Sequence, residues 1–169
     1  MPDQIISLDD IDAIIFDFDG VLTDNRVLLD QDGKEWVTCH RGDGLAFDTF
    51  RKLKLSVYIV STEKNPVVSA RGAKLKVPVL QGINNKVEAL AKLSQDTNLD
   101  LSRTLYVGND LNDLGAIGLC GYSACPADSH FKIKDVTTVT LELNGGTGIA
   151  RELLENILNV NIEQILYSK

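Results

Sequence analysis

Two aspartates, Asp17 and Asp19, follow an apolar run that is typical of a buried strand. Residues 13–16 and Phe18 are apolar with almost no alternation, the pattern of a parallel strand covered on both faces. Carboxylates are costly inside such a strand, so we expect them at its carboxyl end, where open α/β sheets hold their ligands. Gly20 then permits a tight turn. The pair suits an ion-bound nucleophile and a proton donor, although an acidic turn after a strand would also explain it.

Three further polar features follow in order along the chain. Ser61 and Thr62 come after the predicted strand 56–60, Lys86 opens a predicted helix, and Asn109-Asp110 follows the predicted strand 104–107. Each has an ordinary explanation, namely a turn, a solvated lysine and a helix cap. Their ordered placement at the ends of strands and helices favours one site instead.

This order resembles the haloacid dehalogenase (HAD) phosphohydrolase superfamily, whose first signature D-x-D-G-x-x-x-D matches residues 17–24. Alternating buried strands and helices predict a doubly wound, Rossmann-like parallel sheet of the α/β class. The loop after the first strand would lie at the topological switch point, where several strand ends converge on one ion and one phosphate.

The resemblance implies a phosphoric monoester hydrolase that depends on Mg²⁺. Asp17 would attack phosphorus and form an aspartyl-phosphate, while Asp19 would protonate the leaving group and then deprotonate water. Mg²⁺ would be held by the carboxylates of Asp17 and Asp110 and by the backbone carbonyl of Asp19. Three more polar residues complete the set: Ser61 and Lys86 on the phosphoryl oxygens, and Asp113, which would hold either the metal's water or Lys86.

Composition predicts one domain over residues 1–169. The chain is 44% hydrophobic and carries a formal charge of −7, which disfavours nucleic acid and anionic membranes as partners. No apolar run is long enough to span a membrane and no signal peptide opens the chain, so we expect a cytoplasmic protein. Cys39, Cys120 and Cys125 lack metal-ligand spacing; free thiols are expected, with a bridge between Cys120 and Cys125 left open.

The chain has no room for the cap domain that shields the site in many relatives. Residues 26–38 predict a β-hairpin flap, followed by one helix over 45–53, and one helix fits between Ser61 and Lys86. A site without a cap is open, so either its substrate is a macromolecule or a neighbouring subunit closes it. The second option is favoured because the hairpin would otherwise expose several apolar residues, which are Val27, Leu28, Leu29, Trp36 and Val37.

Further motifs resemble the capless sugar-acid phosphatases. These motifs are D-G-V-L-T-D at 19–24, R-G-D-G at 41–44, Q-G-x-x-N-K at 81–86 and N-G-G-T-G-x-x-R-E at 144–152. That group includes octulosonate 8-phosphate and nonulosonate 9-phosphate phosphatases and the C-terminal domains of some acylneuraminate cytidylyltransferases. It implies a Mg²⁺-dependent homotetramer. The glycine-rich segment 144–148 is expected to reach a neighbour's active site, to cap the helix that follows it, or to do both.

The choice of substrate depends on fewer residues. Octulosonate phosphatases usually carry Thr-Gly-Arg after the second strand, whereas this chain has Ser61-Thr62-Glu63. Glu63, with Lys74 and Arg71 on the next helix, resembles the nonulosonate branch, so a nonulosonate 9-phosphate is the first prediction and octulosonate 8-phosphate the alternative. Gly20, Thr62 and Asn109 complete the predicted substrate contacts. A catalytically silent oligomerisation module and a protein phosphatase are the two remaining hypotheses.

Overall fold

The computed structural model describes residues 6–168 and contains a six-stranded, all-parallel sheet in the order β5-β4-β1-β6-β7-β8. The strands are β1 (Ala13–Phe16), β4 (Ser56–Val60), β5 (Val79–Leu80), β6 (Thr104–Val107), β7 (Tyr122–Cys125) and β8 (Val139–Thr140). The chain moves outward from β1 in one direction through β4 and β5, and in the other through β6 to β8. The direction of winding therefore reverses between β1 and β6, which is the topological switch point. The predicted doubly wound sheet is confirmed.

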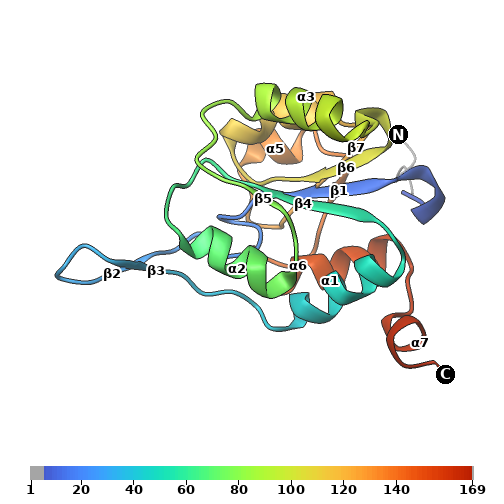
Figure 1. The fold of residues 1–169 in the computed structure, drawn as a ribbon, viewed down its shortest axis with the longest axis horizontal. Helices are drawn as coiled ribbons and strands as arrows, with labels where there is room; N and C mark the ends of the chain where they lie inside the picture. Colours follow the sequence, from blue (N-terminus) through green and yellow to red (C-terminus); the bar gives the residue numbers. More distant parts are fainter. Residues whose placement is uncertain (1–5, 169) are drawn as a thin grey trace.

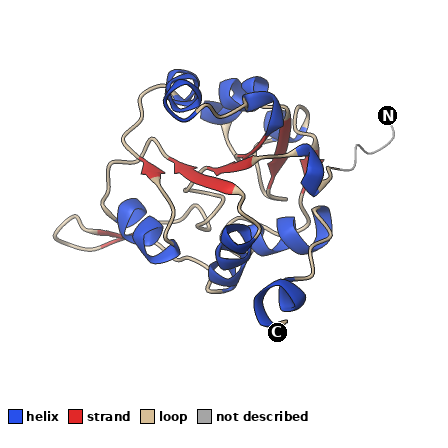
Figure 2. Ribbon diagram, turned by 45° about the vertical axis from the view of Figure 1, so that its right-hand side comes forward, coloured by secondary structure: helices blue, strands red, loops and turns tan. Residues whose placement is uncertain are grey.

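Helices cover both faces of this sheet (Figures 1 and 2). They are α1 (Gly42–Lys52), α2 (Val67–Leu75), α3 (Lys86–Thr97), α4 (Leu114–Leu119), α5 (Phe131–Lys134), α6 (Ile149–Glu152) and α7 (Ile162–Tyr167). Single helical turns lie at Leu8–Asp10, Leu101–Arg103 and Leu111–Asp113, and a π-helical stretch, Leu153–Ile157, continues α6. One apolar layer lies between the sheet and α1, α2 and α6, and the other lies under α3, α4 and α5.

The central strand β1 is buried along its whole length, because it contributes side chains to both layers. Phe16 faces α1, where its ring centroid lies 5.3 Å from that of Phe47 and 6.1 Å from that of Phe50. Ile15 faces the opposite layer. This packing fixes β1, and with it the position of Asp17, which follows the strand directly.

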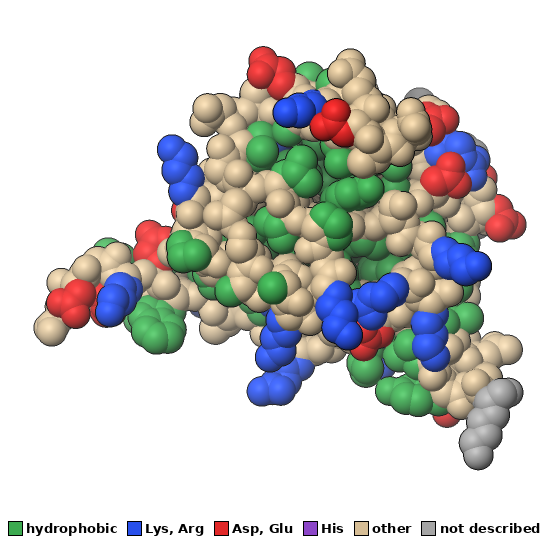
Figure 3. Space-filling view, viewed as in Figure 1, with side chains coloured by type: hydrophobic (Ala, Val, Ile, Leu, Met, Phe, Trp, Pro, Cys, Tyr) green, Lys and Arg blue, Asp and Glu red, His purple; other side chains and the backbone are tan. Residues whose placement is uncertain are grey.

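The hairpin of β2 (Leu28–Leu29) and β3 (Glu35–Trp36) projects from the body of the molecule (Figures 1 and 3). Its turn is closed by Asp30, whose Oδ1 accepts the N–H groups of Asp32 and Lys34. Leu28 is 71% exposed and Trp36 61% exposed. Val37, which the sequence suggested would be exposed with them, is instead half-buried and packs against the core. Within the described residues, the segments after Asp24 and after Ser61 hold no cap domain.

Helix starts agree with the sequence to within a few residues. Asn85 caps α3 by accepting the N–H groups of Val87 and Glu88. Helix α2 begins at Val67, whose N–H donates to Asn65 Oδ1. Helix α1 begins at Gly42, before the predicted residue 45. The three cysteines are free thiols, and no helix among the described residues is long and apolar enough to cross a membrane.

Candidate active site

The carboxyl ends of β1, β4 and β6 bring the predicted polar residues to one edge of the sheet. Asp17 follows β1, Ser61 follows β4, and Gly108-Asn109-Asp110 follows β6. The N–H of Asp17 donates to the carbonyl of Val107 at 2.8 Å, which continues the pairing of β1 with β6 beyond the strands themselves. The sheet register therefore sets the distance between the loop that carries Asp17 and the loop that carries Asp110.

Lys86, the first residue of α3, lies between two buried carboxylates. Its Nζ is 2.9 Å from Asp17 Oδ1 and 2.6 Å from Asp113 Oδ1. The three side chains are almost completely removed from solvent, with 2%, 7% and 0% exposed for Lys86, Asp17 and Asp113. An ammonium in such surroundings requires both partners, because each unpaired buried charge costs several kcal/mol.

Asp113 receives four hydrogen bonds, which use all the acceptor positions of a carboxylate. Its Oδ1 accepts from Lys86 Nζ and from the hydroxyl of Tyr106 at 2.7 Å. Its Oδ2 accepts the N–H groups of Asn109 at 2.9 Å and Asp110 at 3.2 Å. Of the two roles considered for Asp113, the structure places it on Lys86, where it also holds the loop that leads to Asp110.

The electrostatics of this edge are dominated by excess negative charge. Burial, and secondarily the charge of Asp113, raise the pKa of Asp17 to about 7, although Lys86 and the N–H of Phe18 oppose the shift. Burial lowers the pKa of Lys86, but the charges of Asp17 and Asp113 outweigh it and raise the pKa overall. Lys86 is therefore held as a cation, and its single charge does not balance the carboxylates around it.

Asp19 lies beside this cluster in a partly buried position. Burial, followed by the charge of Glu63, raises the pKa of Asp19, while its hydrogen bond from Thr23 opposes the shift. A raised pKa keeps a larger fraction of the carboxyl protonated near neutral pH, which is what a proton donor to a leaving group requires. Asp19 lies two residues after Asp17, so the Asp17 carboxyl is buried while the Asp19 carboxyl is only partly buried.

The carboxylates of Asp17 and Asp110 suit a hard divalent cation whose coordination shell is completed by water and a backbone carbonyl. Asp110 is exposed at the open edge, and one of its oxygens accepts the N–H of Leu111 at 2.7 Å. No group of three or more His, Cys, Asp or Glu side chains within residues 6–168 is arranged to hold a metal by itself. Two carboxylates with a backbone oxygen remain a suitable Mg²⁺ set, because Mg²⁺ usually keeps several waters. A dication would also offset the excess negative charge described above.

Ser61, Gly20 and Asn109 line the same edge. Ser61 is buried, and its Oγ accepts the N–H of Glu63, which leaves the hydroxyl hydrogen free to donate. Gly20 has a φ of +79°, and a Cβ built on it would lie 2.0 Å from the side-chain nitrogen of Asn109. Only glycine permits this approach. Thr62 is exposed on the loop that follows Ser61.

Of the three residues predicted to select the sugar, Arg71 and Lys74 lie in a separate hollow, and Glu63 supports its own turn. Glu63 Oε1 accepts the N–H groups of Lys64 and Asn65 and so supports its own turn, although its charge reaches Asp19. Arg71 donates to the carbonyl of His40 at 2.9 Å. Arg71 and Lys74 line a hollow of about 180 Å³ whose other residues are Arg41, Gly44, Asp48 and Leu75. None of the predicted catalytic residues lines this hollow.

The glycine-rich segment 144–148 packs against the loop that follows Asp17 in its own chain. The N–H of Gly146 donates to the carbonyl of Val21 at 2.9 Å, and a Cβ on Gly145 would lie 2.1 Å from the carbonyl oxygen of Gly20. Backbone therefore lies directly on backbone, which leaves Gly145 buried. This packing agrees with a loop that leads into the helix at Ile149. That the segment also reaches a neighbour's active site stays a prediction.

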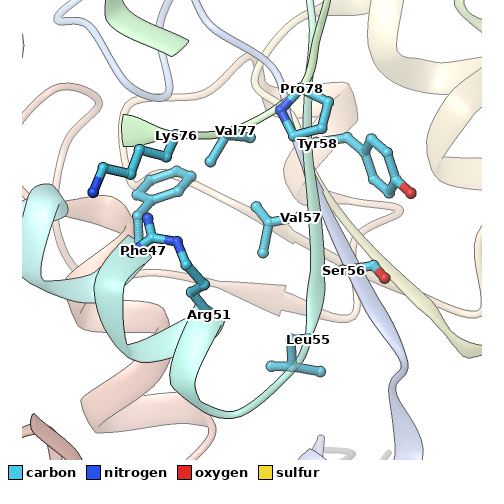
Figure 4. Close-up of a pocket in the computed structure, with 9 residues that line it drawn as sticks. All are labelled: Phe47, Arg51, Leu55, Ser56, Val57, Tyr58, Lys76, Val77 and Pro78. Atoms are coloured by element: carbon cyan, nitrogen blue, oxygen red, sulfur yellow. The ribbon is translucent and has the colours of Figure 1, made fainter. Parts of the chain in front are cut away.

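A second hollow, of about 250 Å³, lies at the opposite end of the sheet (Figure 4). It opens beside the first three residues of β4, which are Ser56, Val57 and Tyr58. It contains none of the predicted site residues. Concavity by itself therefore does not mark the catalytic edge of this molecule.

Sequence reasoning missed Tyr106, whose hydroxyl contacts Asp113. The sequence places Tyr106 in a buried strand, and nothing in its spacing signals a hydrogen bond to a residue seven positions later. It also missed Asp128, which accepts the N–H of Gly145, and Glu152, which accepts those of Glu142 and Leu143. These carboxylates hold the segment that packs on the loop that follows Asp17.

Comparison with known proteins agrees with this geometry. The family described as haloacid dehalogenase-like hydrolase matches residues 61–153, more than half of the chain. The chain belongs to this family. Of solved structures, a HAD family hydrolase from Streptomyces avermitilis shares 43% identity with this HAD hydrolase at a TM-score of 0.91, covering 95% of this chain and 92% of that one. The superfamily and fold predicted from the sequence are therefore confirmed.

The curated relatives of this HAD hydrolase include 3-deoxy-D-manno-octulosonate 8-phosphate phosphatases. The enzyme of Haemophilus influenzae is 31% identical over 152 residues, which cover 89% of this chain and 84% of the relative. A structure of the same phosphatase from Moraxella catarrhalis, solved with a magnesium ion, a phosphate ion and a KDO molecule, has a TM-score of 0.85 and 26% identity, covering 91% of this chain and 89% of that one. Both relatives are named for the same substrate, 3-deoxy-D-manno-octulosonate 8-phosphate.

Replacing Lys86 tests the buried cluster directly. We expect Lys86→Met to lower the free energy of unfolding by about 3–5 kcal/mol, because Asp17 and Asp113 would be left as uncompensated buried charges. Urea denaturation without added metal measures this. Lys92→Met, an exposed lysine on the same helix, should change the value by less than about 0.5 kcal/mol. Adding Asp17→Asn to Lys86→Met should recover part of the loss; equal effects of the two lysine substitutions would contradict the paired cluster.

Proposed function

We propose that this HAD hydrolase is a Mg²⁺-dependent phosphoric monoester hydrolase that acts on a sugar-acid phosphate through an aspartyl-phosphate on Asp17. The observation that carries the proposal is the position of Lys86, shared between Asp17 and Asp113 at the carboxyl edge of the sheet. It gives a phosphate both a nucleophile and a fixed positive charge. A silent oligomerisation module would have no need of such a costly buried arrangement.

The reaction needs a large reduction in barrier, roughly 20 kcal/mol or more for a phosphate monoester. An Asp17 oxygen attacks phosphorus and forms the phosphorus–oxygen bond of the aspartyl-phosphate as the bond to the sugar oxygen breaks. Asp19 gives its proton to that leaving oxygen. It then takes a proton from the water that attacks the aspartyl-phosphate, which releases phosphate and regenerates both carboxyl groups.

Three groups stabilise the transferred phosphoryl group. The Lys86 ammonium and the Ser61 hydroxyl donate to its oxygens and are held in place before the substrate arrives. Asp17 and Asp110 through their carboxylates, and Asp19 through its carbonyl, would hold Mg²⁺, which would offset negative charge on the phosphoryl group and on Asp17. Gly20, Thr62 and Asn109 form the adjacent wall of the site.

For the substrate, 3-deoxy-D-manno-octulosonate 8-phosphate takes precedence over a nonulosonate 9-phosphate. Relatives named for the octulosonate reaction align with 89–92% of this chain, and their agreement outweighs the short Ser61-Thr62-Glu63 departure. The geometry adds a reason, since Glu63 already supports its own turn and Lys74 is exposed in a separate hollow. The nonulosonate remains the second candidate because Glu63 resembles that branch. The charge of Glu63 also acts on Asp19, so Glu63 lies near the proposed proton donor.

The proposed enzyme is a homotetramer assembled through the hairpin, residues 26–38. Support comes from the exposed apolar side chains of β2 and β3, which a second subunit would cover. An assembly of this kind would also narrow an edge that no cap covers, which argues against a protein substrate.

Replacement of the nucleophile tests the covalent reaction. Asp17→Asn should reduce turnover of an aryl phosphate below detection, because an amide cannot form the aspartyl-phosphate. Asp19→Asn should lower kcat by about 10²–10⁴-fold in a folded protein, the range for general acid–base catalysis. Asp96→Asn, an exposed aspartate on α3, is the matched control and should keep full activity. Near-normal turnover by Asp17→Asn would rule out the covalent route.

A phosphate-release panel tests the substrate. It compares octulosonate 8-phosphate, nonulosonate 9-phosphate, an aryl phosphate and a phosphopeptide, each with Mg²⁺ and with EDTA. We expect the highest kcat/KM for octulosonate 8-phosphate and no activity in EDTA. If nonulosonate 9-phosphate is preferred and Glu63→Ala costs about 1–3 kcal/mol on it alone, the size of one charge-assisted contact, the second candidate is correct. Preference for the phosphopeptide would refute both.

A further inference from the structure

Tyr106 is a fully buried tyrosine in the middle of β6, with its ring in the apolar layer under α3, α4 and α5. Its hydroxyl is the one polar atom that the ring carries into this layer, and it lies 2.7 Å from Asp113 Oδ1. Burial and the nearby charge of Asp113 raise the pKa of Tyr106 well above its usual range. The hydroxyl is therefore protonated and acts as a donor to the carboxylate.

The same oxygen of Asp113 accepts from Lys86 at 2.6 Å. With the two backbone N–H groups on Oδ2, the carboxylate is held by four donors from three elements, which are β6, α3 and the loop after β6. Two donors on Oδ1 restrict where either one can lie. Removing the hydroxyl would leave Lys86 as the sole partner of Oδ1 and would allow the ammonium to move toward Asp113 and away from Asp17.

We infer that Tyr106 is a positioning residue of the phosphoryl transfer reaction. Its hydroxyl fixes Asp113, and through Asp113 it fixes the Lys86 ammonium against Asp17 and the phosphoryl group. The inference rests on the proposed function, because only a reaction at Asp17 makes the exact place of that ammonium matter. Tyr106 does not itself touch the reacting atoms.

The sheet provides a matched control in Tyr58. The register pairs Ile15 with Tyr58 on one side and with Tyr106 on the other, so the two tyrosines lie in the same row of the sheet. Both pack in the same apolar layer. The Tyr58 hydroxyl points away from the neighbouring hollow (Figure 4) and makes no hydrogen bond to any residue within 6–168. Tyr58→Phe thus removes the same atom without touching Asp113.

The test measures Tyr106→Phe and Tyr58→Phe as full-length, Mg²⁺-loaded proteins on an aryl phosphate. We expect Tyr106→Phe to lower kcat about tenfold or more, the scale of one hydrogen bond to a charged group. KM and the Mg²⁺ concentration for half-maximal activity should stay within about twofold, because the hydroxyl contacts neither substrate nor metal. Tyr58→Phe should match the wild type. In an Asp113→Asn background, Tyr106→Phe should cost less than about twofold further, since its effect passes through Asp113.

A second measurement needs no turnover. The ¹⁵N resonance of the Lys86 ammonium, assigned by its loss in Lys86→Met, should shift in substrate-free Tyr106→Phe and stay in place in Tyr58→Phe. The inference is overturned if Tyr106→Phe keeps kcat within about twofold of wild type, if Tyr58→Phe loses as much, or if the resonance does not move. A wild-type protein that lacks phosphatase activity altogether would instead refute the proposed function.

Discussion

One buried ammonium shared by two buried carboxylates constrains the whole catalytic edge. Lys86 can remain charged there only if Asp17 and Asp113 both stay in place, and each of those residues belongs to a different part of the sheet. Asp17 depends on β1, whose side chains fill both apolar layers, and Asp113 depends on the turn after β6. The pairing of β1 with β6 and the start of α3 at Lys86 place the three charged groups so that this electrostatic requirement is met. In the proposed reaction, the positive charge that this arrangement keeps on Lys86 stabilises the phosphoryl group.

The second constraint is an open edge without a cap domain. Within the described residues, the walls available to a substrate are short loops. The loop that follows Asp17 packs against Gly145 and Gly146. Asp128 and Glu152 support that glycine segment through backbone N–H groups. The polar contacts that could select a sugar are consequently few, and the apolar hairpin leaves closure of the site to another subunit in the proposed assembly.

The strands and the polar residues that follow them could be predicted from sequence because both follow local rules. Continuous apolar runs identified β1 and β6, and the ordered carboxylates, hydroxyl and lysine identified the edge where they meet. Features that depend on packing between distant segments could not be predicted. Examples are the hydrogen bond of the Tyr106 hydroxyl to Asp113, the contact of Gly145 with Gly20, and the hollow that Arg71 and Lys74 of α2 line together with residues of α1. The partial burial of Val37 is a further case, since this residue follows β3 and its burial comes from contact with the core.

The measurement that tests the central claim most directly is the chemical capture of the phosphorylated residue. The Mg²⁺-loaded enzyme is mixed with an excess of aryl phosphate, quenched within one turnover and treated with borohydride, which reduces an acyl phosphate to an alcohol. Tandem mass spectrometry of the digest should then find homoserine at position 17, in place of Asp17, and at none of Asp19, Asp110 or Asp113. An unmodified Asp17 in enzyme shown to be turning over, or homoserine at another of these positions, would contradict the account.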